Sequence, residues 1–158
     1  MAHANPSDPD VKQLLTDATT IAMVGASSNP DKASYGIMQK LQSVGYRVIP
    51  VNPRETEVLG EQSFKSLADV PVPVDVVNVF RAPDALPQIA REAVAIGARN
   101  LWCQFSVINE EGGRIAEAGG LSVIMDRCLK VEHARYLGRM HWLGFNTQRI
   151  TSVRGGLQ

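Results

Sequence analysis

The sequence predicts an α/β protein in which one domain is built on a parallel five-stranded sheet. Short apolar runs that do not alternate recur along the chain, as expected for strands that are buried on both faces. Segments with apolar residues at helical spacing separate these runs, and glycines stand where helices would end. Helices that alternate with buried strands cover both faces of a doubly wound sheet, so we expect a three-layer α/β/α arrangement with strand order 3-2-1-4-5.

The first part of this pattern covers residues 20–53 and predicts a βαβ unit of the Rossmann-like, nucleotide-binding type. Residues 21–24 form the first apolar run, and Gly25 ends it. A helix is expected from Ser34, and residues 46–51 form the second apolar run. Two buried strands that are joined through a helix lie parallel, with the helix packed on the sheet.

The other elements follow from caps and apolar patterns in the same way. Ser7 is expected to cap a first helix, because Asp10 stands at the third position after it. Later strands are expected at 74–80, 100–103 and 121–125, and later helices at 84–96, 110–118 and 129–137. We expect residues 1–6 to be disordered, residues 7–138 to form the domain, and residues 139–158 to pack either on this domain or on a second copy.

Composition limits the classes of partner. The chain of 158 residues carries 16 Lys plus Arg and 16 Asp plus Glu, so its net charge gives no general attraction to nucleic acid or to an anionic membrane. Its two cysteines lack C-x-x-C spacing, which argues against a zinc site or a disulfide framework. No apolar run approaches about 18 residues, and the first residues lack the features of a signal peptide. We therefore expect a cytoplasmic protein with no membrane or nucleic-acid partner.

The turn after the first predicted strand indicates a phosphate site, because the following helix would point its free N–H groups at this turn. Gly25 lets the backbone come close to a ligand. Ser27 and Ser34 offer hydroxyl groups, and Lys32 offers a positive charge. The glycine pattern is incomplete compared with G-x-G-x-x-G, so a tight turn that binds no ligand is the alternative.

The corner after the second predicted strand has the sequence Asn52-Pro53-Arg54. NAD-binding units usually carry a carboxylate at this strand tip, which holds the ribose hydroxyls. This chain has no carboxylate at the strand tip, and an arginine there suits a ribose that itself bears a phosphate. NADP and coenzyme A (CoA) both contain such a ribose, and the residue chemistry alone leaves both open.

Several longer segments occur in a recognisable order: VGASSNPDKASYGIMQKLQSVGYRVIPVNP, SLADVPVPVDVVNVFR, LWCQ, NEEGG, GLSVIMDRC and GFNTQRITS. Together they resemble the small stand-alone CoA-binding domain proteins, which are related to the CoA-binding N-terminal domain of the succinyl-CoA synthetase alpha subunit. The resemblance extends over about residues 14–153. It implies that CoA lies across the carboxyl ends of the strands. The glycine loop would then take the pyrophosphate, while the Asn-Pro corner and the loop after the third strand would cradle the adenosine.

The resemblance and the residue chemistry together define an expected site for CoA or an acyl-CoA. Phe80 is expected either to stack beside a purine or to pack in the core, and Arg81 either to meet a phosphate or to be solvated. Gln104 is expected to hydrogen-bond the pantetheine amides, and the resembling proteins usually have glycine where Ser106 stands. The expected cofactor-binding residues are Gly25, Ala26, Ser27, Lys32, Ser34, Tyr35, Gly36, Val51, Asn52, Pro53, Arg54, Phe80, Arg81 and Gln104.

We expect no catalytic residue and no metal site, because no nucleophile with a base and no ligand spacing is evident. His133 is expected to be an ordinary surface histidine beside Glu132. Cys128 is either a buried inert thiol or a thiolate that exchanges with the CoA thiol. The expected function is CoA binding without independent catalysis, with a homodimer as one arrangement. The alternatives are an NADP-binding oxidoreductase-type domain and an enzyme that acts on a CoA thioester.

Overall fold

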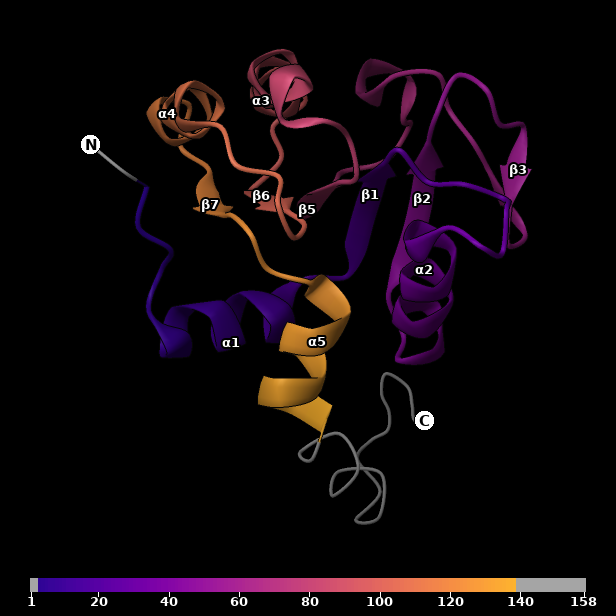
Figure 1. Ribbon diagram of the computed structural model, residues 1–158, viewed down its shortest axis with the longest axis horizontal. Helices are drawn as coiled ribbons and strands as arrows, with labels where there is room; N and C mark the ends of the chain where they lie inside the picture. Colours follow the sequence, from indigo (N-terminus) through magenta and orange to yellow (C-terminus); the bar gives the residue numbers. More distant parts are fainter. Residues whose placement is uncertain (1–2, 139–158) are drawn as a thin grey trace.

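Five parallel strands form the sheet at the centre of the computed structural model, which describes residues 3–138 (Figure 1). The strands lie in the order β2-β1-β5-β6-β7. Their bounds are β1 (Thr20–Val24), β2 (Arg47–Val51), β5 (Val76–Val79), β6 (Asn100–Cys103) and β7 (Ser122–Ile124). All four neighbouring pairs are parallel, which confirms the predicted fold class.

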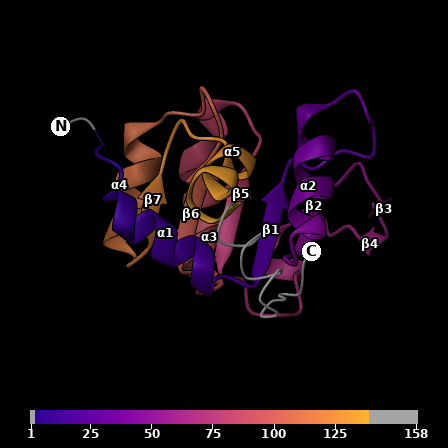
Figure 2. The ribbon, with the colours of Figure 1, turned by 90° about the horizontal axis from the view of Figure 1, so that it is seen from below.

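Helices cover both faces of this sheet (Figures 1 and 2). One face carries α1 (Asp8–Asp17), α2 (Ala33–Ser43) and α5 (Leu129–His133), which continues into the π-helical turn η3 (Ala134–Gly138). The other face carries α3 (Leu86–Ala95) and α4 (Glu110–Ala118). Shorter elements are the hairpin β3 (Glu57–Val58) and β4 (Glu61–Gln62), η1 (Leu67–Asp69) and η2 (Pro83–Ala85). No helix within residues 3–138 is long and apolar enough to cross a membrane.

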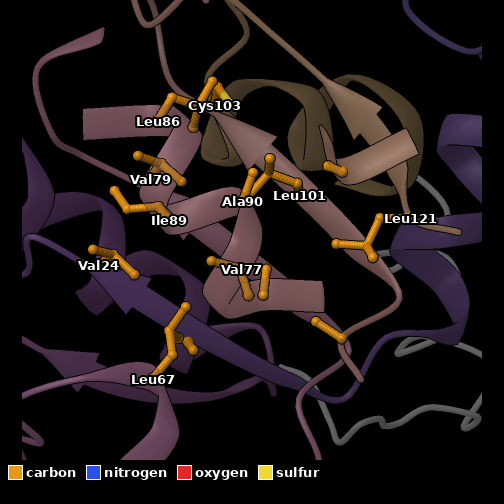
Figure 3. Packing of buried hydrophobic residues seen from close by; sticks show 14 of the residues in the cluster. Val24, Leu67, Val77, Val79, Leu86, Ile89, Ala90, Leu101, Cys103 and Leu121 are labelled. Carbon is orange, nitrogen blue, oxygen red and sulfur yellow. The ribbon is translucent and has the colours of Figure 1, made fainter. Parts of the chain in front are cut away.

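Alternate side chains of each strand enter two separate cores, as the period of a strand requires. On the side of α3, Val77 and Leu101 belong to the same buried cluster as Leu86 (Figure 3). On the side of α1, α2 and α5, Met23 and Trp102 belong to the second cluster. Both faces of the central strands are therefore covered, which explains why their sequences are mostly apolar, with Asn78 of β5 as a buried polar exception. The predicted three-layer arrangement is confirmed.

The predicted strand order 3-2-1-4-5 is wrong, because β5 pairs with β1 and does not pair with β2. Counted along the five strands of this sheet, the observed order is 2-1-3-4-5. The segment around Phe64 covers the outer edge of β2. The Phe64 N–H donates to the Pro50 carbonyl at 3.0 Å, and the Asn52 N–H donates to the Phe64 carbonyl at 2.8 Å. Because this edge of β2 is covered, the next strand of the sheet, β5, pairs with the free edge of β1.

Pro50 is the sequence signal for this order. A proline has no N–H to give to a ladder, so it occurs at the edges of sheets and not in central strands. Because the Pro50 carbonyl faces Phe64, the side of Pro50 that lacks an N–H is the outer edge of β2. In the predicted order, β2 would have been an inner strand, and Pro50 would have left one ladder hydrogen bond unmade.

Residues 3–5, before α1, contact the edge strand β7 and α4. The Asn5 side chain donates to the Met125 carbonyl at 3.1 Å and accepts from the Met125 N–H at 2.9 Å. The His3 ring lies 2.9 Å from the Val123 carbonyl. The expected disorder of residues 1–6 stays a prediction, and residues 1–2 and the predicted tail at 139–158 lie outside the described residues.

Asp75 ties the amino ends of β1 and β5 together. Its carboxylate accepts from the N–H groups of Thr19 and Thr20 at 2.8 and 3.0 Å and from the Thr19 hydroxyl at 3.0 Å. Burial by itself would raise the pKa of Asp75, but these hydrogen bonds and the nearby Arg99 outweigh it, so the pKa lies below its ordinary value. The ionised carboxylate therefore stabilises the pairing of β1 and β5 at their amino ends.

At the opposite end of the strands, the backbones that follow β1 and β5 come close together. Gly25 has φ +93°, and its N–H donates to the Val51 carbonyl at 2.9 Å. A Cβ at this position would lie 2.4 Å from the Phe80 carbonyl oxygen. Gly25 is thus required twice, by its left-handed backbone and by the closeness of Phe80.

The Asp75 contacts predict a stability that depends on pH. Because the native pKa of Asp75 is lowered, its contribution is present at neutral pH and is lost as the pH falls through the native pKa, below about pH 4. Asp75→Asn should be less stable at pH 7 and should lose less stability than the natural protein between about pH 5 and pH 3. Urea unfolding across this range measures both. If the free energy of unfolding changed equally with pH in the two proteins, the role assigned to Asp75 would be contradicted.

Gly25→Ala should destabilise the fold by about 2–4 kcal/mol, because it combines an unfavourable backbone conformation with a backbone clash. Gly36→Ala is the matched control, since a Cβ at Gly36 meets nothing within 4 Å. The control should be neutral or slightly stabilising, as alanine favours a helix. Chemical denaturation of both variants measures the difference. A Gly25→Ala protein as stable as the control would contradict the described close approach.

Candidate functional site

A cavity of about 670 Å³ lies at the carboxyl ends of β1, β2 and β5. This is the place where the winding of the sheet reverses, because β1 leads to β2 on one side and β5 lies on the other. Backbone loops leave the sheet in opposite directions there, which opens a crevice. The lining residues are Gly25, Ser27, Lys32, Ala33, Ser34, Asn52, Pro53, Arg54, Glu55, Phe80 and Arg81.

The loop between β1 and α2 is held in shape by its own polar groups. The Ser27 hydroxyl accepts from the Asn29 N–H at 3.0 Å, and the Asn29 side-chain oxygen accepts from the Asp31 N–H at 2.9 Å. The Lys32 N–H donates to the Asn29 carbonyl at 3.0 Å. Such short-range turns are typical of Ser and Asn in loops. The shape of the loop is therefore determined by hydrogen bonds within the loop itself.

Helix α2 points its first turn at the cavity. Lys32 is its N-cap residue, and no side chain caps its free N–H groups. Two other helices differ in this respect: Ser7 caps α1 by accepting from Asp10, and Asn109 caps α4 by accepting from Gly112. An uncapped helix start presents N–H donors and the positive end of the helix dipole, which is a favourable environment for an anion.

Asn52 connects the two loops that border the cavity. Its side-chain nitrogen donates to the Ala26 carbonyl at 2.8 Å, and its side-chain oxygen accepts from the Arg54 N–H at 2.9 Å. The Asn52 carbonyl accepts from the Glu55 N–H at 3.1 Å and from the Ser63 hydroxyl at 3.1 Å. The side chain of Asn52 is thus occupied by the protein itself. Its role is to position the corner after β2 beside the loop after β1.

The cavity carries three cations and one anion. Lys32, Arg54 and Arg81 are exposed, and within residues 3–138 none of them forms an ion pair. The anion is Glu55, whose carboxylate accepts from the Ser28 N–H at 3.0 Å. Hydrogen bonds from the backbone and the side chain of Ser28 lower the pKa of Glu55, so this group is ionised at neutral pH. The excess of positive charge suits a multiply charged anion.

Sequence reasoning missed two lining residues, Ala33 and Glu55. Ala33 carries no polar side chain that could have identified it. Glu55 does have a signal, because an Asn-Pro corner predicts a turn, and a turn of this kind reverses the chain within three residues. The Glu55 N–H donation to Asn52 is that turn, and it returns the carboxylate over the loop after β1. The corner thus does carry a carboxylate, three residues beyond Asn52.

Nine of the predicted site residues line the cavity and five do not. Ala26 and Val51 are buried, and they contribute backbone carbonyls that accept from Asn52 and Gly25. Tyr35 and Gly36 lie in the first turns of α2 but outside the cavity lining.

Gln104 is the fifth of these residues, and it is held away from the cavity by the core. It is 6% exposed, and its side-chain oxygen accepts from the Asn78 side chain at 3.1 Å and from the Leu129 N–H at 3.2 Å. Gln104 therefore connects β5 to the start of α5. Its carbonyl oxygen is used within the protein, which differs from the predicted contact with pantetheine amides.

The loop after β6 explains the glycine of the resembling proteins. Ser106 has φ +68°, a left-handed conformation that favours glycine. Its N–H donates to the Asp126 carboxylate at 2.7 Å, and Asp126 itself has φ +57°. The preceding Phe105 is 58% exposed.

Groups that could carry chemistry are buried or isolated. Cys128 is 6% exposed at the start of α5, which favours the inert thiol over the exchanging thiolate. Burial raises the pKa of Cys103 to about 12. His133, expected on the surface, is 5% exposed, and its ring lies edge-on to Tyr46 with 5.5 Å between centroids. Within the described part of the chain, no three His, Cys, Asp or Glu side chains are grouped as metal ligands would be.

Comparison with known proteins identifies the relatives of this chain. The CoA binding domain family matches residues 19–134. YneT, an uncharacterized protein of Bacillus subtilis, is 41% identical over 130 residues, which cover 82% of this chain and 96% of YneT. The alpha subunit of ADP-forming acetate–CoA ligase II of Pyrococcus furiosus is 30% identical over 122 residues, which cover 70% of this chain. The match spans only 27% of that subunit.

Solved structures of proteins of similar length have the same fold as this chain. A hypothetical protein from Pyrococcus horikoshii superimposes with a TM-score of 0.82 at 35% identity, covering 87% of this chain and 100% of that one. A protein of Thermus thermophilus gives a TM-score of 0.80 at 37% identity, covering 83% of this chain and 99% of that one. Small stand-alone proteins thus share this fold, and one part of a larger ligase subunit is similar to this chain in sequence. The chain belongs to the CoA binding domain family.

Proposed function

We propose that this protein binds CoA or an acyl-CoA in the cavity at the carboxyl ends of β1, β2 and β5. The observation that carries the proposal is the convergence of three cations, Lys32, Arg54 and Arg81, on the uncapped start of α2; none of them forms an ion pair with another residue of 3–138. The net charge of the chain is zero, so this positive cluster is a local feature. Local positive charge with free backbone N–H groups recognises phosphate, and CoA carries phosphate groups at two positions.

The two phosphate positions of CoA match two parts of the cavity. The diphosphate lies at the start of α2 beside Gly25 and Lys32, where no side chain caps the free N–H groups of the helix. The phosphorylated ribose lies at the corner after β2, where Arg54 follows the turn of Asn52. Phe80 and Arg81 border the same cavity from the end of β5 and face the adenine. The volume of about 670 Å³ falls within the range of small-molecule sites.

The proposed role is that of a binding module that stores, senses or presents CoA, without catalysis of its own. The titratable residues that line the cavity are Lys32, Arg54, Glu55 and Arg81. Glu55 is already engaged by the Ser28 N–H, and the other three residues are cations. Such a set can bind and orient an anion, but it offers no activated nucleophile. A homodimer and a cytoplasmic location stay predictions.

Calorimetric titration tests this proposal with four ligands: CoA, acetyl-CoA, dephospho-CoA and NADPH. We expect CoA to bind in the micromolar range and NADPH to bind more weakly. Arg54→Ala should weaken CoA binding about tenfold, because it removes a charged hydrogen-bond partner of the ribose phosphate at an exposed site. The same variant should change binding of dephospho-CoA little, because that ligand lacks the ribose phosphate. Lys32→Ala should weaken both ligands.

Arg47→Ala is the matched control for this titration, since Arg47 is an exposed arginine at the start of β2, whereas Arg54 follows the end of β2. It should leave every affinity unchanged. NADPH that binds more tightly than CoA would overturn the choice of ligand. Equal effects of Arg54→Ala and Arg47→Ala would overturn the proposed position of the ribose phosphate.

A second prediction concerns Asn52, which shapes the cavity without a free side-chain group of its own. Asn52→Ala removes the hydrogen bonds to Ala26 and Arg54 and should cost about 1–3 kcal/mol of stability. It should also weaken CoA binding, because the two loops are no longer held together. Asn52→Asp keeps the acceptor for Arg54 but loses the donor to Ala26, so its affinity should also fall. Unchanged CoA affinity in both variants would contradict this positioning role.

A further inference from the structure

Among the described residues that line the cavity, Glu55 is the one acidic side chain. It lies on the corner after β2, and its carboxylate reaches the loop after β1, where it accepts from the Ser28 N–H at 3.0 Å. Three cations share the same lining. None of them pairs with Glu55, whose hydrogen-bond partner is Ser28. The position of this carboxylate is therefore set by a backbone donor and not by charge neutralisation.

A backbone N–H at the turn before α2 is the type of donor that a phosphate oxygen uses. A carboxylate oxygen and a phosphate oxygen make the same demand on such a donor, and both are strong charged acceptors. Glu55 thus occupies a donor of the loop that borders the proposed phosphate position. The lowered pKa of Glu55 agrees with this view, because the carboxylate stays anionic at neutral pH.

The loop does not need Glu55 to keep its shape. Ser27 and Asn29 already fold it through hydrogen bonds to the N–H groups of Asn29 and Asp31, at 3.0 and 2.9 Å. Asn52 independently ties the loop to the corner after β2 through the Ala26 carbonyl. Removal of the Glu55 charge therefore leaves the scaffold of the cavity in place. What changes is the electrostatic potential of the cavity and the availability of one N–H donor.

We infer that Glu55 is a specificity-determining residue: its carboxylate competes with the ligand diphosphate for the Ser28 N–H, and its charge repels the ribose phosphate at the corner after β2, so that it disfavours the more highly phosphorylated ligand. The inference rests on the proposed function, since it takes CoA as the ligand. Binding of CoA then requires the carboxylate to leave Ser28 or to remain beside the phosphates at a cost in repulsion. In either case the residue lowers affinity and narrows the difference between CoA and dephospho-CoA.

Glu55→Gln is the direct test, because glutamine keeps the size of the side chain and removes its charge. The variant should bind CoA about tenfold more tightly than the natural protein at about 50 mM salt. The gain for dephospho-CoA should be smaller, since that ligand carries fewer phosphate charges. At about 500 mM salt the gain should shrink for both ligands, because screening weakens repulsion between exposed charges. Calorimetry on the full chain measures all of these affinities.

Glu57→Gln is the matched control, since Glu57 is an exposed carboxylate two residues further along, in β3, and is absent from the cavity lining. It should change no affinity. If the natural protein binds CoA while Glu55→Gln binds it equally or more weakly, the inference is overturned and the proposed function stands. If neither the natural protein nor Glu55→Gln binds CoA, the proposed function fails, and the inference fails with it.

Discussion

The close approach of backbone at the carboxyl ends of β1 and β5 is the constraint on which the cavity depends. Gly25 has no side chain, so the Phe80 carbonyl comes to a position that any Cβ would occupy. The two strands can therefore end side by side, while the chain leaves β1 in the direction of α2. The start of α2 is brought to the same edge of the sheet, with its N–H groups uncapped.

A second contact extends this arrangement to β2. Asn52 holds the corner after β2 against the Ala26 carbonyl, so the loops after β1 and β2 form one continuous wall of the cavity. The wall presents Arg54 and Glu55, while the end of β5 presents Arg81. The short turn after β2 thus contributes one positive and one negative charge to the cavity, beside Lys32 and Arg81. The fold supplies the position of these side chains, and we propose that they determine the ligand.

Most of the fold could be predicted from the sequence, because its strands and helices are locally consistent. Residues 100–103 and 110–118 match the structure residue for residue. The strand order could not be obtained from a general preference for 3-2-1-4-5, although Pro50 pointed to an edge strand. The predicted residues that line the cavity lie at strand ends and in the loops that follow them, where the sequence pattern places them. Glu55 was missed because its place depends on a turn and not on a strand tip. Gln104 was predicted to contact the ligand but lies in the core, because it bonds to Asn78 and Leu129, which are distant in sequence.

The central claim is that CoA lies at the edge of the sheet where Gly25, the start of α2 and the Asn52 corner meet. Amide NMR spectra recorded during a CoA titration test this claim most directly, because they report position and not only affinity. We predict that the largest shifts fall on residues 25–34 and 52–55 and on Phe80 and Arg81. Shifts that fall instead beneath α1, at the opposite edge of the sheet, with residues 25–34 unchanged, would contradict it.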